Sequence, residues 1–399
     1  MSLSLLEEAL LPYERKLQSQ ERLRRRLGVR EVDRPTYERY ITGPVERFDR
    51  RKNGFMTMVE GNPFGEDFRD KLRKRIGDDF LAPPRYAELS VEARMEFSLA
   101  QAASKVNDDY RPELPPVTPA ETRVPVSDPT WMTRFIKKAG LLFGAEMVRI
   151  ARLDQRWMYE GLDIPHKYAI LIVDTHIPSL MHTAPSHLTE LGTEEIYARL
   201  KITANQLADL IRRLGYDAVD RETSGFDPAM LMVPLAIDAG IGEFSRMGMV
   251  LSPEFGTNMR LRAITTDLPL DADRPISFNV HDFCMSCEIC AQRCPAKAIP
   301  LGPPTDKPTD YHNNTGCRKW FINSERCLSY IYADRKTWTN CARCIAFCPW
   351  NKSLNLMHNA VRWSAIHFPT ALKKLLISGD EMTHLRHRRD NKWRGPIAR

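Results

Sequence analysis

The chain has 399 residues, of which 43% are hydrophobic and 27% are charged, and its formal net charge is +7. This length allows one extended core or two to three smaller domains of an ordinary soluble protein. The composition excludes a membrane helix of roughly 18 to 20 apolar residues, because the most apolar stretch, LLFGAEMVRI, contains Glu146 and Arg149.

Residues 1–112 are expected to form a helical N-terminal cap, because they consist of helical segments and polar connections rich in Arg, Glu and Tyr. An arginine run lies at Arg24–Arg26, but a polar segment follows it where an export signal would place an apolar core. A cytoplasmic protein is therefore expected. Residues 113–130 are dense in proline, which disfavours helix, and predict a linker.

An α/β domain is predicted over residues 131–275. The run 131–153 places apolar residues at helical spacing, and KYAILIVDTHI (167–177) predicts a buried strand. Residues 193–219 predict an amphipathic helix that ends at Gly215. A second helix with a glycine-rich exit is predicted over 231–256, and a further strand over 261–270.

Eight of the nine cysteines fall into a short window that predicts a ferredoxin-like domain at residues 276–355. One run follows the pattern C-x2-C-x2-C-x3-C-P, and a shortened second run follows it. In such runs the last cysteine binds the other cluster. The spacing assigns Cys284, Cys287, Cys290 and Cys348 to one [4Fe–4S] cluster, and Cys294, Cys327, Cys341 and Cys344 to the other.

Two questions about the cysteines stay open at this point: which metal the two runs bind, and what role Cys317 has. Four-cysteine zinc sites use similar C-x2-C pairs, although the repeated spacing before proline favours iron–sulfur clusters. Cys317 is expected to be a small buried side chain and not a ligand.

Paired clusters predict an electron relay, but the spacing does not identify what uses the electrons. No G-x-G-x-x-G turn follows a strand, so the sequence does not support a Rossmann nucleotide site. The segment Asp174-Thr-His176 approaches the Asp-x-His-x-x-Gly pattern that supplies a lower histidine ligand to cobalamin in other enzymes. Ser179 stands where that pattern needs glycine, so His176 is expected to be an ordinary core or surface histidine.

Residues 240–270, GIGEFSRMGMVLSPEFGTNMRLRAITTDLPL, resemble the corrinoid-binding core of the cobalamin-dependent reductive dehalogenase family. Further similar segments are RFDRRKNGFM, FGAEMVRIARLDQRWMY, HNNTGCRKWFINSERC and CPWNK, so the resemblance covers about residues 40–395. It implies an α+β fold in which a nitroreductase-like cobalamin domain joins a ferredoxin-like domain. The corrinoid would be bound base-off, without a protein ligand on cobalt.

The resemblance also implies site residues. Tyr197, on the helix that ends in Leu-Gly-Tyr, matches the family's catalytic tyrosine, and Arg260 matches an arginine that follows the Pro-Glu-Phe-Gly turn. Tyrosine is ordinarily protonated at neutral pH and can supply a proton, and a nearby arginine would stabilise the phenolate. Residues expected to contact the corrinoid are Ser245, Arg246, Met247, Gly248, Phe255, Asn313 and Asn314.

The chain departs from the family pattern at Asp227, which stands where many members carry Asn or Lys beside the substrate. Asp227 could be catalytic or could cap a turn before Pro228. An aspartate donor is a feature of the related epoxyqueuosine reductases, and Cys327-Leu-Ser-Tyr330 resembles their C-I-S-Y segment. The turn beginning at Gly242 follows the dehalogenase form.

The sequence therefore favours an oxidoreductase that cleaves a carbon–halogen bond of an organohalide. The alternatives are an epoxyqueuosine reductase-like tRNA-modifying enzyme, another corrinoid-dependent reductase, and a non-enzymatic electron carrier. The expected partner is an external reductant such as ferredoxin or flavodoxin. The basic C-terminal segment, residues 356–399, is expected to be a solvated or partner-docking surface in preference to a nucleic-acid site.

Overall fold

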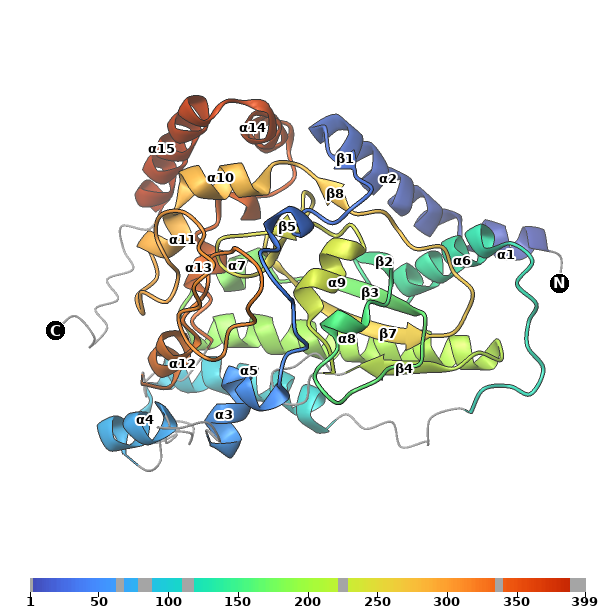
Figure 1. The fold of residues 1–399 in the computed structure, drawn as a ribbon, viewed down its shortest axis with the longest axis horizontal. Coiled ribbons are helices and arrows are strands. Elements are labelled where there is room, and N and C mark those ends of the chain that lie inside the picture. The colour runs from blue at the N-terminus through green and yellow to red at the C-terminus, as the bar shows by residue number, and fades with distance from the viewer. Residues whose placement is uncertain are drawn as a thin grey trace.

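The structure, a computed structural model, describes residues 3–61, 68–77, 88–109, 118–221, 229–333 and 340–387. Its centre is an antiparallel four-stranded sheet in the order β2-β3-β7-β4, surrounded by helices (Figure 1). These strands are β2 (Met147–Arg152), β3 (Tyr168–Thr175), β7 (Met259–Thr266) and β4 (Ala218–Arg221). The mixed helix and sheet architecture confirms the predicted α+β class.

The two faces of the sheet build separate cores because successive side chains of a strand point to opposite sides. In β3, Ile170 and Ile172 join the core beneath α6 (Pro129–Leu142) and α8 (His187–Arg213). Leu171 and Val173 join the core on the other side, beneath α9 (Met232–Asp238). The strand predicted at 167–177 is thus confirmed as a fully buried strand, and the strand predicted at 261–270 corresponds to β7.

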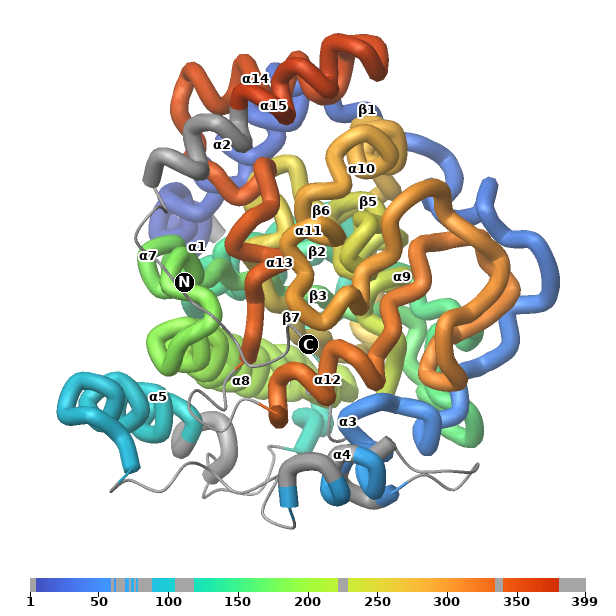
Figure 2. Tube along the Cα trace, turned by 90° about the vertical axis from the view of Figure 1, so that its left-hand side faces the viewer, coloured from blue at the N-terminus to red at the C-terminus, as the bar shows by residue number. Residues whose placement is uncertain are grey.

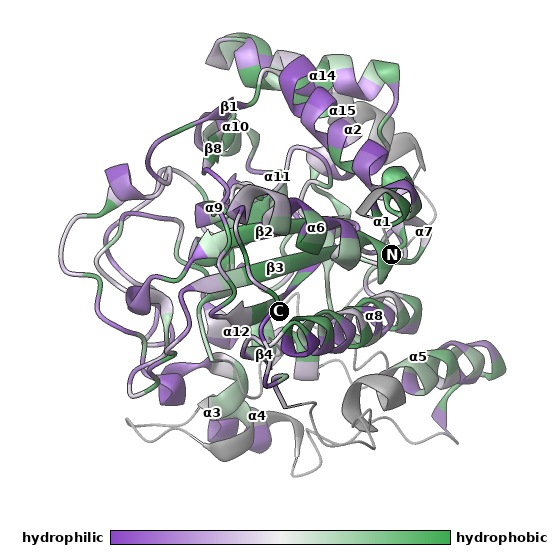
Figure 3. Cartoon of the chain, turned by 90° about the vertical axis from the view of Figure 1, so that its right-hand side faces the viewer, coloured by the Kyte–Doolittle hydropathy of each residue, from purple (hydrophilic) through white to green (hydrophobic). Residues whose placement is uncertain are grey.

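Helix α8 is amphipathic and lies along the sheet, as its green and purple sides in Figure 3 show. It begins earlier than predicted because the Ser186 hydroxyl caps it by accepting a hydrogen bond from the Thr189 amide at 3.2 Å. It ends before Gly215, whose φ of +86° is left-handed, as the predicted glycine stop requires. This helix positions Tyr197 over the sheet.

Two element predictions need correction. The run 131–153 is a helix followed by a strand: α6 ends at Leu142, Gly144 takes a φ of +118°, and β2 begins at Met147. The apolar spacing of the second half therefore reflects a strand buried on both faces. The helix predicted over 231–256 is confined to α9, after which β5 (Glu243–Phe244) and β6 (Val250–Leu251) form a hairpin.

The cysteine-bearing segments follow the sheet domain in sequence. β8 (Ile276–Ser277) pairs with β1 (Arg30–Glu31) and leads into α10 (Val280–Cys287) and α11 (Ile289–Gln292). The second run lies around α12 (Ser324–Ala333) and α13 (Arg343–Ala346). The C-terminal helices α14 (Leu356–His367) and α15 (Thr370–His387) pack against α10. None of the helices described here combines the length and apolarity needed to cross a lipid bilayer.

The N-terminal segment contributes helices to two places in the molecule (Figure 1). α2 (Leu11–Leu27) packs against α6 and α14, whereas α5 (Val91–Asp109) lies along α8. The other α-helices among the described residues of the segment are α1 (Leu3–Ala9), α3 (Gly54–Glu60) and α4 (Phe68–Ile76). The short α7 (Pro178–Met181) precedes α8. The predicted boundary at 112/113 lies outside the described residues, so the domain limits stay predictions.

A buried ion pair fastens α2 to the sheet domain. The Arg24 guanidinium contacts the Glu254 carboxylate and donates to the Gly240 carbonyl at 2.7 Å, and both side chains of the pair are buried. Burial alone would raise the pKa of Glu254, but the Arg24 charge and hydrogen bond bring that pKa below its ordinary value. The Glu254 carboxylate is therefore ionised and paired with Arg24 at neutral pH.

We expect Arg24→Met to destabilise the protein by about 3–5 kcal/mol, because it leaves the Glu254 carboxylate buried and unpaired. Arg25→Met, which removes an exposed neighbouring arginine, is the matched control and should change stability by less than about 0.5 kcal/mol. Urea unfolding monitored by circular dichroism measures both. Since the folded pKa of Glu254 is lowered, its contribution is complete above its unfolded pKa and is lost as pH falls through the folded value. Equal midpoints for the two variants would contradict this account.

Candidate functional site

The first cysteine quartet surrounds one small cavity. Its members, Cys284, Cys287, Cys290 and Cys348, all line a space of about 20 Å³. α10 supplies the first two, α11 supplies the third, and the fourth directly precedes the short helical turn Pro349–Asn351. The four cysteines thus come from three segments and line one cavity.

Electrostatics favour the protonated thiol form in this quartet when no cation is bound. Burial raises the pKa of Cys284 to about 11 and that of Cys348 to about 12. Burial also raises the pKa of Cys287, and the neighbouring Cys284 and Cys348 sulfurs raise it further. Iron ions would relieve both effects, so the donor set fits an iron–sulfur cluster.

The second quartet, Cys294, Cys327, Cys341 and Cys344, is also grouped in space. Burial raises the pKa of Cys327, and the three other sulfurs of the quartet add to that rise. Cys344 also contributes to the raised pKa of Cys290, so the two quartets are neighbours. All nine cysteines are free thiols. The last cysteine of each run, Cys294 and Cys348, is thus grouped with cysteines of the other run.

The backbone around the first quartet is fixed by a buried arginine. Arg246 donates from Nε to the Cys284 carbonyl at 3.0 Å and lies 4.7 Å from the Trp320 ring centre. Ser245 donates its hydroxyl to the Met249 carbonyl at 2.7 Å, which closes the turn that carries Arg246. Ser245, Arg246 and Met247, expected at the corrinoid, line the small cavity of the first quartet.

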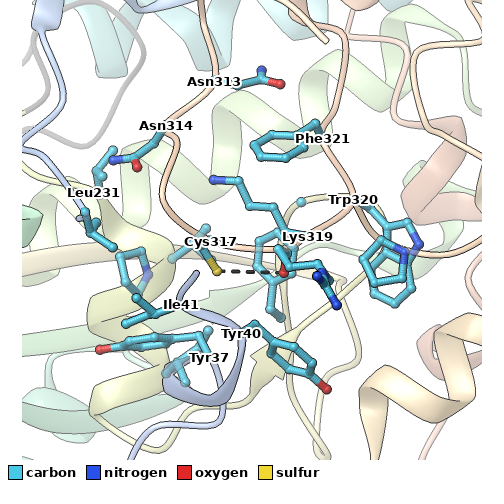
Figure 4. Close-up of a pocket in the computed structure, with 18 of the residues that line it drawn as sticks. Tyr37, Tyr40, Ile41, Leu231, Asn313, Asn314, Cys317, Lys319, Trp320 and Phe321 are labelled. Atoms are coloured by element: carbon cyan, nitrogen blue, oxygen red, sulfur yellow. Dashed lines mark hydrogen bonds between the residues drawn. The ribbon is translucent and has the colours of Figure 1, made fainter. Parts of the chain in front are cut away.

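A larger cavity of about 300 Å³ lies beside the cysteine segments (Figure 4). Gly248, Asn313 and Asn314, three of the residues expected to contact a corrinoid, line it. Gly248 has a φ of +77°, and a Cβ there would lie 2.9 Å from the Ile322 side chain. Only glycine therefore allows this close approach of the turn to the 311–322 segment. Aromatic walls include Tyr37, Tyr40 and Phe321.

Lys319 places a half-buried cationic side chain at the wall of this cavity. Its side chain lies between Cys317 and Phe321 in Figure 4, with Nζ 5.0 Å from the Phe321 ring centre. Burial lowers the pKa of Lys319, and the Cys317 sulfur offsets part of that effect. No carboxylate among the described residues forms an ion pair with it. Cys317 itself is half-buried at the wall of the cavity and belongs to neither quartet.

Tyr197 and Arg260 come together from α8 and β7. The guanidinium carbon of Arg260 lies 5.7 Å from the Tyr197 ring centre. Asp174, which faces Arg260 in the β3–β7 register, is held by Arg199 at 2.7 Å. Arg260 Nη1 donates to its neighbour's carbonyl at 3.2 Å, while the buried Nε has no hydrogen-bond partner within the described part of the chain. The guanidinium therefore keeps donor capacity for a bound group.

Two further residues near Arg260 carry chemistry that the sequence did not assign. His176 is buried, its Nδ1 bonds the Gly192 carbonyl at 3.0 Å, and its Nε2 has no partner among the described residues. Burial and the Arg260 charge lower the pKa of His176 to about 3, so the ring is neutral. Burial raises the pKa of Glu190, whose carboxylate accepts from the Asn340 amide at 2.7 Å.

The remaining predicted site residues fall elsewhere. Phe255 packs at the edge of the core beneath α9. Asp227 lies outside the described residues. His176, which was expected from the sequence to be an ordinary core or surface histidine, is buried near Arg260. The feature that singles out His176 is its buried Nε2, which has no hydrogen-bond partner among the described residues, and a sequence pattern cannot show it.

Comparison with known proteins shows which families and structures these features are similar to. Residues 283–351 match the family described as "4Fe-4S double cluster binding domain", which confirms two iron–sulfur clusters over the zinc alternative. The tetrachloroethene reductive dehalogenase of Sulfurospirillum multivorans is 31% identical over 275 residues, covering 59% of this chain and 54% of the relative. The Desulfitobacterium hafniense enzyme of the same name is 30% identical over 281 residues, covering 58% and 50%.

The fold is similar to that of a solved reductive dehalogenase. The catabolic reductive dehalogenase NpRdhA aligns with a TM-score of 0.69 and 26% identity, covering 90% of this chain and 49% of that structure. An epoxyqueuosine reductase of Lactococcus garvieae is 27% identical over 175 residues, covering 41% of this chain and 43% of the relative. The chain spans about half the length of the reductive dehalogenases it matches.

Proposed function

We propose that this chain is a member of the cobalamin-dependent reductive dehalogenase family and that it replaces a carbon–halogen bond of an organohalide by a carbon–hydrogen bond. The reaction consumes two electrons and one proton and releases one halide ion. The family binds cobalamin and two [4Fe–4S] clusters; when bound, the corrinoid supplies strongly reducing cobalt and the clusters supply its electrons.

The pairing of Tyr197 with Arg260 is the observation that carries this proposal. The phenol of Tyr197 would give the proton to the carbon that loses halide. Arg260, with its guanidinium carbon 5.7 Å from the Tyr197 ring centre, would stabilise the phenolate that remains. Half-buried Tyr197 can be reprotonated after each turnover. An electron carrier without enzymatic activity would need neither residue.

The proposal is tested by halide release. The protein is expressed anaerobically with cobalamin, its clusters are reconstituted, and reduced methyl viologen drives turnover of a panel of aryl and alkyl halides. Release of halide by the wild-type protein is expected for at least one class. Turnover of epoxyqueuosine in a tRNA stem-loop, without halide release from any substrate, would instead favour the tRNA-modifying alternative, for which Asp227 is the proposed donor.

Lys319 and the larger cavity are proposed to hold the phosphodiester of the corrinoid's nucleotide tail. The Lys319 ammonium has no acidic partner among the described residues, and the aromatic walls suit a flat base. Gly248, Asn313 and Asn314 would contact the same ligand, and Ser245, Arg246, Met247 and Phe255 would support its surroundings. The proposed cluster ligands are the two cysteine quartets, and Cys317 lies outside both.

We expect Lys319→Gln to weaken cobalamin binding by about 10- to 100-fold, because it removes a charge-assisted hydrogen bond. Cobinamide, which lacks the nucleotide tail, should bind the variant and the wild-type protein equally. Lys307→Gln, at an exposed lysine, is the matched control. Equilibrium titration followed by corrinoid absorbance measures all three proteins. Equal weakening for cobalamin and cobinamide would contradict a role at the tail.

We propose a cytoplasmic location, because eight cysteines are proposed as cluster ligands and a reducing compartment keeps such thiols available. The proposed reductant is an external protein such as ferredoxin or flavodoxin.

A further inference from the structure

Basic side chains accompany the second cysteine quartet. Arg293, Arg326 and Arg343 each directly precede a cysteine of that quartet, and Lys297 follows Cys294 by three residues. Lys297 and Arg326 are exposed, and Arg293 and Arg343 are half-buried. These four residues are here called the basic face.

The basic face is continuous in space. Arg326 donates to the Lys297 carbonyl at 3.4 Å, which joins the two exposed cations. Arg293 and Arg343 share the Phe347 ring, with guanidinium carbons 5.6 and 5.5 Å from its centre. The helices beside these arginines, α11 and α13, pack together. Both lie with α12 on the side that faces the viewer in Figure 2.

The nearby carboxylates are turned toward other groups. Glu288 lies 3.2 Å from the buried guanidinium of Arg246, and Glu325 lies 3.9 Å from the His312 ring. Among the described residues, each of these two carboxylates thus contacts a group outside the basic face, Arg246 and His312 respectively. Phe347 stands between Cys344 and Cys348, which belong to different quartets, so a partner over this ring would be close to both clusters.

We propose that the basic face is the docking surface for a small acidic one-electron carrier protein. Opposite charge steers such a partner and raises its association rate, and an aromatic ring flanked by arginines is a common interface anchor. Each docking event passes one electron from the reduced carrier to an oxidised [4Fe–4S] cluster, with no proton transferred. Two events supply the electron pair that the proposed reaction consumes. The inference rests on the proposed function for its purpose, but cluster reduction can be measured without any halide.

The test uses the full chain with cofactors bound, and an acidic [2Fe–2S] ferredoxin as the probe. Stopped-flow bleaching of the visible cluster absorbance gives the reduction rate. Lys297→Glu combined with Arg326→Glu should slow ferredoxin-driven reduction by about 10-fold or more at low ionic strength, and high salt should remove the difference. The milder pair Lys297→Gln with Arg326→Gln should give a smaller loss in the same direction.

Two controls make the result specific. Arg15→Glu reverses an exposed charge on α2, away from the cysteine segments, and should leave the rate unchanged. Reduction by methyl viologen, a small cation, should not be slowed in any variant whose iron content equals that of the wild type. Ferredoxin-driven rates that stay equal to wild type in both double variants would overturn the proposal, as would an equal loss in Arg15→Glu. Normal charge-dependent reduction without halide release would instead remove the proposed function and leave the docking surface in place.

Discussion

Replacement of Tyr197 by Phe is expected to lower halide release by about 10²- to 10⁴-fold, because it removes the proposed proton donor and leaves the ring in place. Cobalt and iron contents should not change, since Tyr197 lies on α8 and belongs to neither cysteine quartet. The measurement is viologen-driven turnover under saturating substrate, with halide quantified by ion chromatography.

Tyr168→Phe is the matched control for this loss. Tyr168 is a half-buried tyrosine at the start of β3, and removing its hydroxyl should change halide release by less than about twofold. Turnover by Tyr197→Phe at the wild-type rate would show that another group delivers the proton. In that case the placement of Arg260 beside Tyr197 would have a structural purpose only.

Replacement of Cys290 by Ser is expected to remove one cluster, so that iron falls from about eight to about four atoms per chain and halide release is lost. Cys290 is buried and its pKa is raised by burial and by the other three sulfurs of its quartet. A serine hydroxyl is a poorer ligand for iron in this surrounding. Iron and acid-labile sulfide assays measure the change.

Cys317→Ser tests the same assignment of cluster ligands at a cysteine that belongs to neither quartet. Cys317 lines the larger cavity and belongs to neither quartet, so its replacement should leave about eight irons per chain. Loss of iron in this variant would mean that the quartets were assigned wrongly. Retention of all iron in Cys290→Ser would mean that the first quartet was assigned wrongly.

Elements with a single strong pattern could be predicted from the sequence. The strand β3 and helix α8 follow from a continuous apolar run and from apolar positions at helical spacing. The helical prediction for 131–153 was wrong in its second half because β2 is buried on both faces. The apolar residues of β2 therefore do not alternate, and their spacing resembles that of a helix. Only the left-handed Gly144 marks the break between helix and strand.

The candidate site also contains some residues that could be predicted from the sequence and others that could not. The cysteine spacing predicted two clusters because most ligands of a cluster lie in one short loop. The geometry of that loop fixes the spacing of the cysteines in the sequence. Two other features depend on contacts between segments far apart in the chain, which no local pattern records. They are the His176 Nε2, which lacks a partner among the described residues, and the raised pKa of Glu190. Lys319 could not be selected from the sequence either, because its burial beside Phe321 is a property of the assembled cavity.

The central claim is tested most directly by the stoichiometry of a single assay with the reconstituted protein. One halide ion should be released for every two electrons taken from reduced methyl viologen, in a protein that contains about eight irons and one cobalt per chain. That ratio would establish a two-electron carbon–halogen reduction. A protein with the same metal content that oxidises viologen without releasing halide from any aryl or alkyl substrate would contradict it.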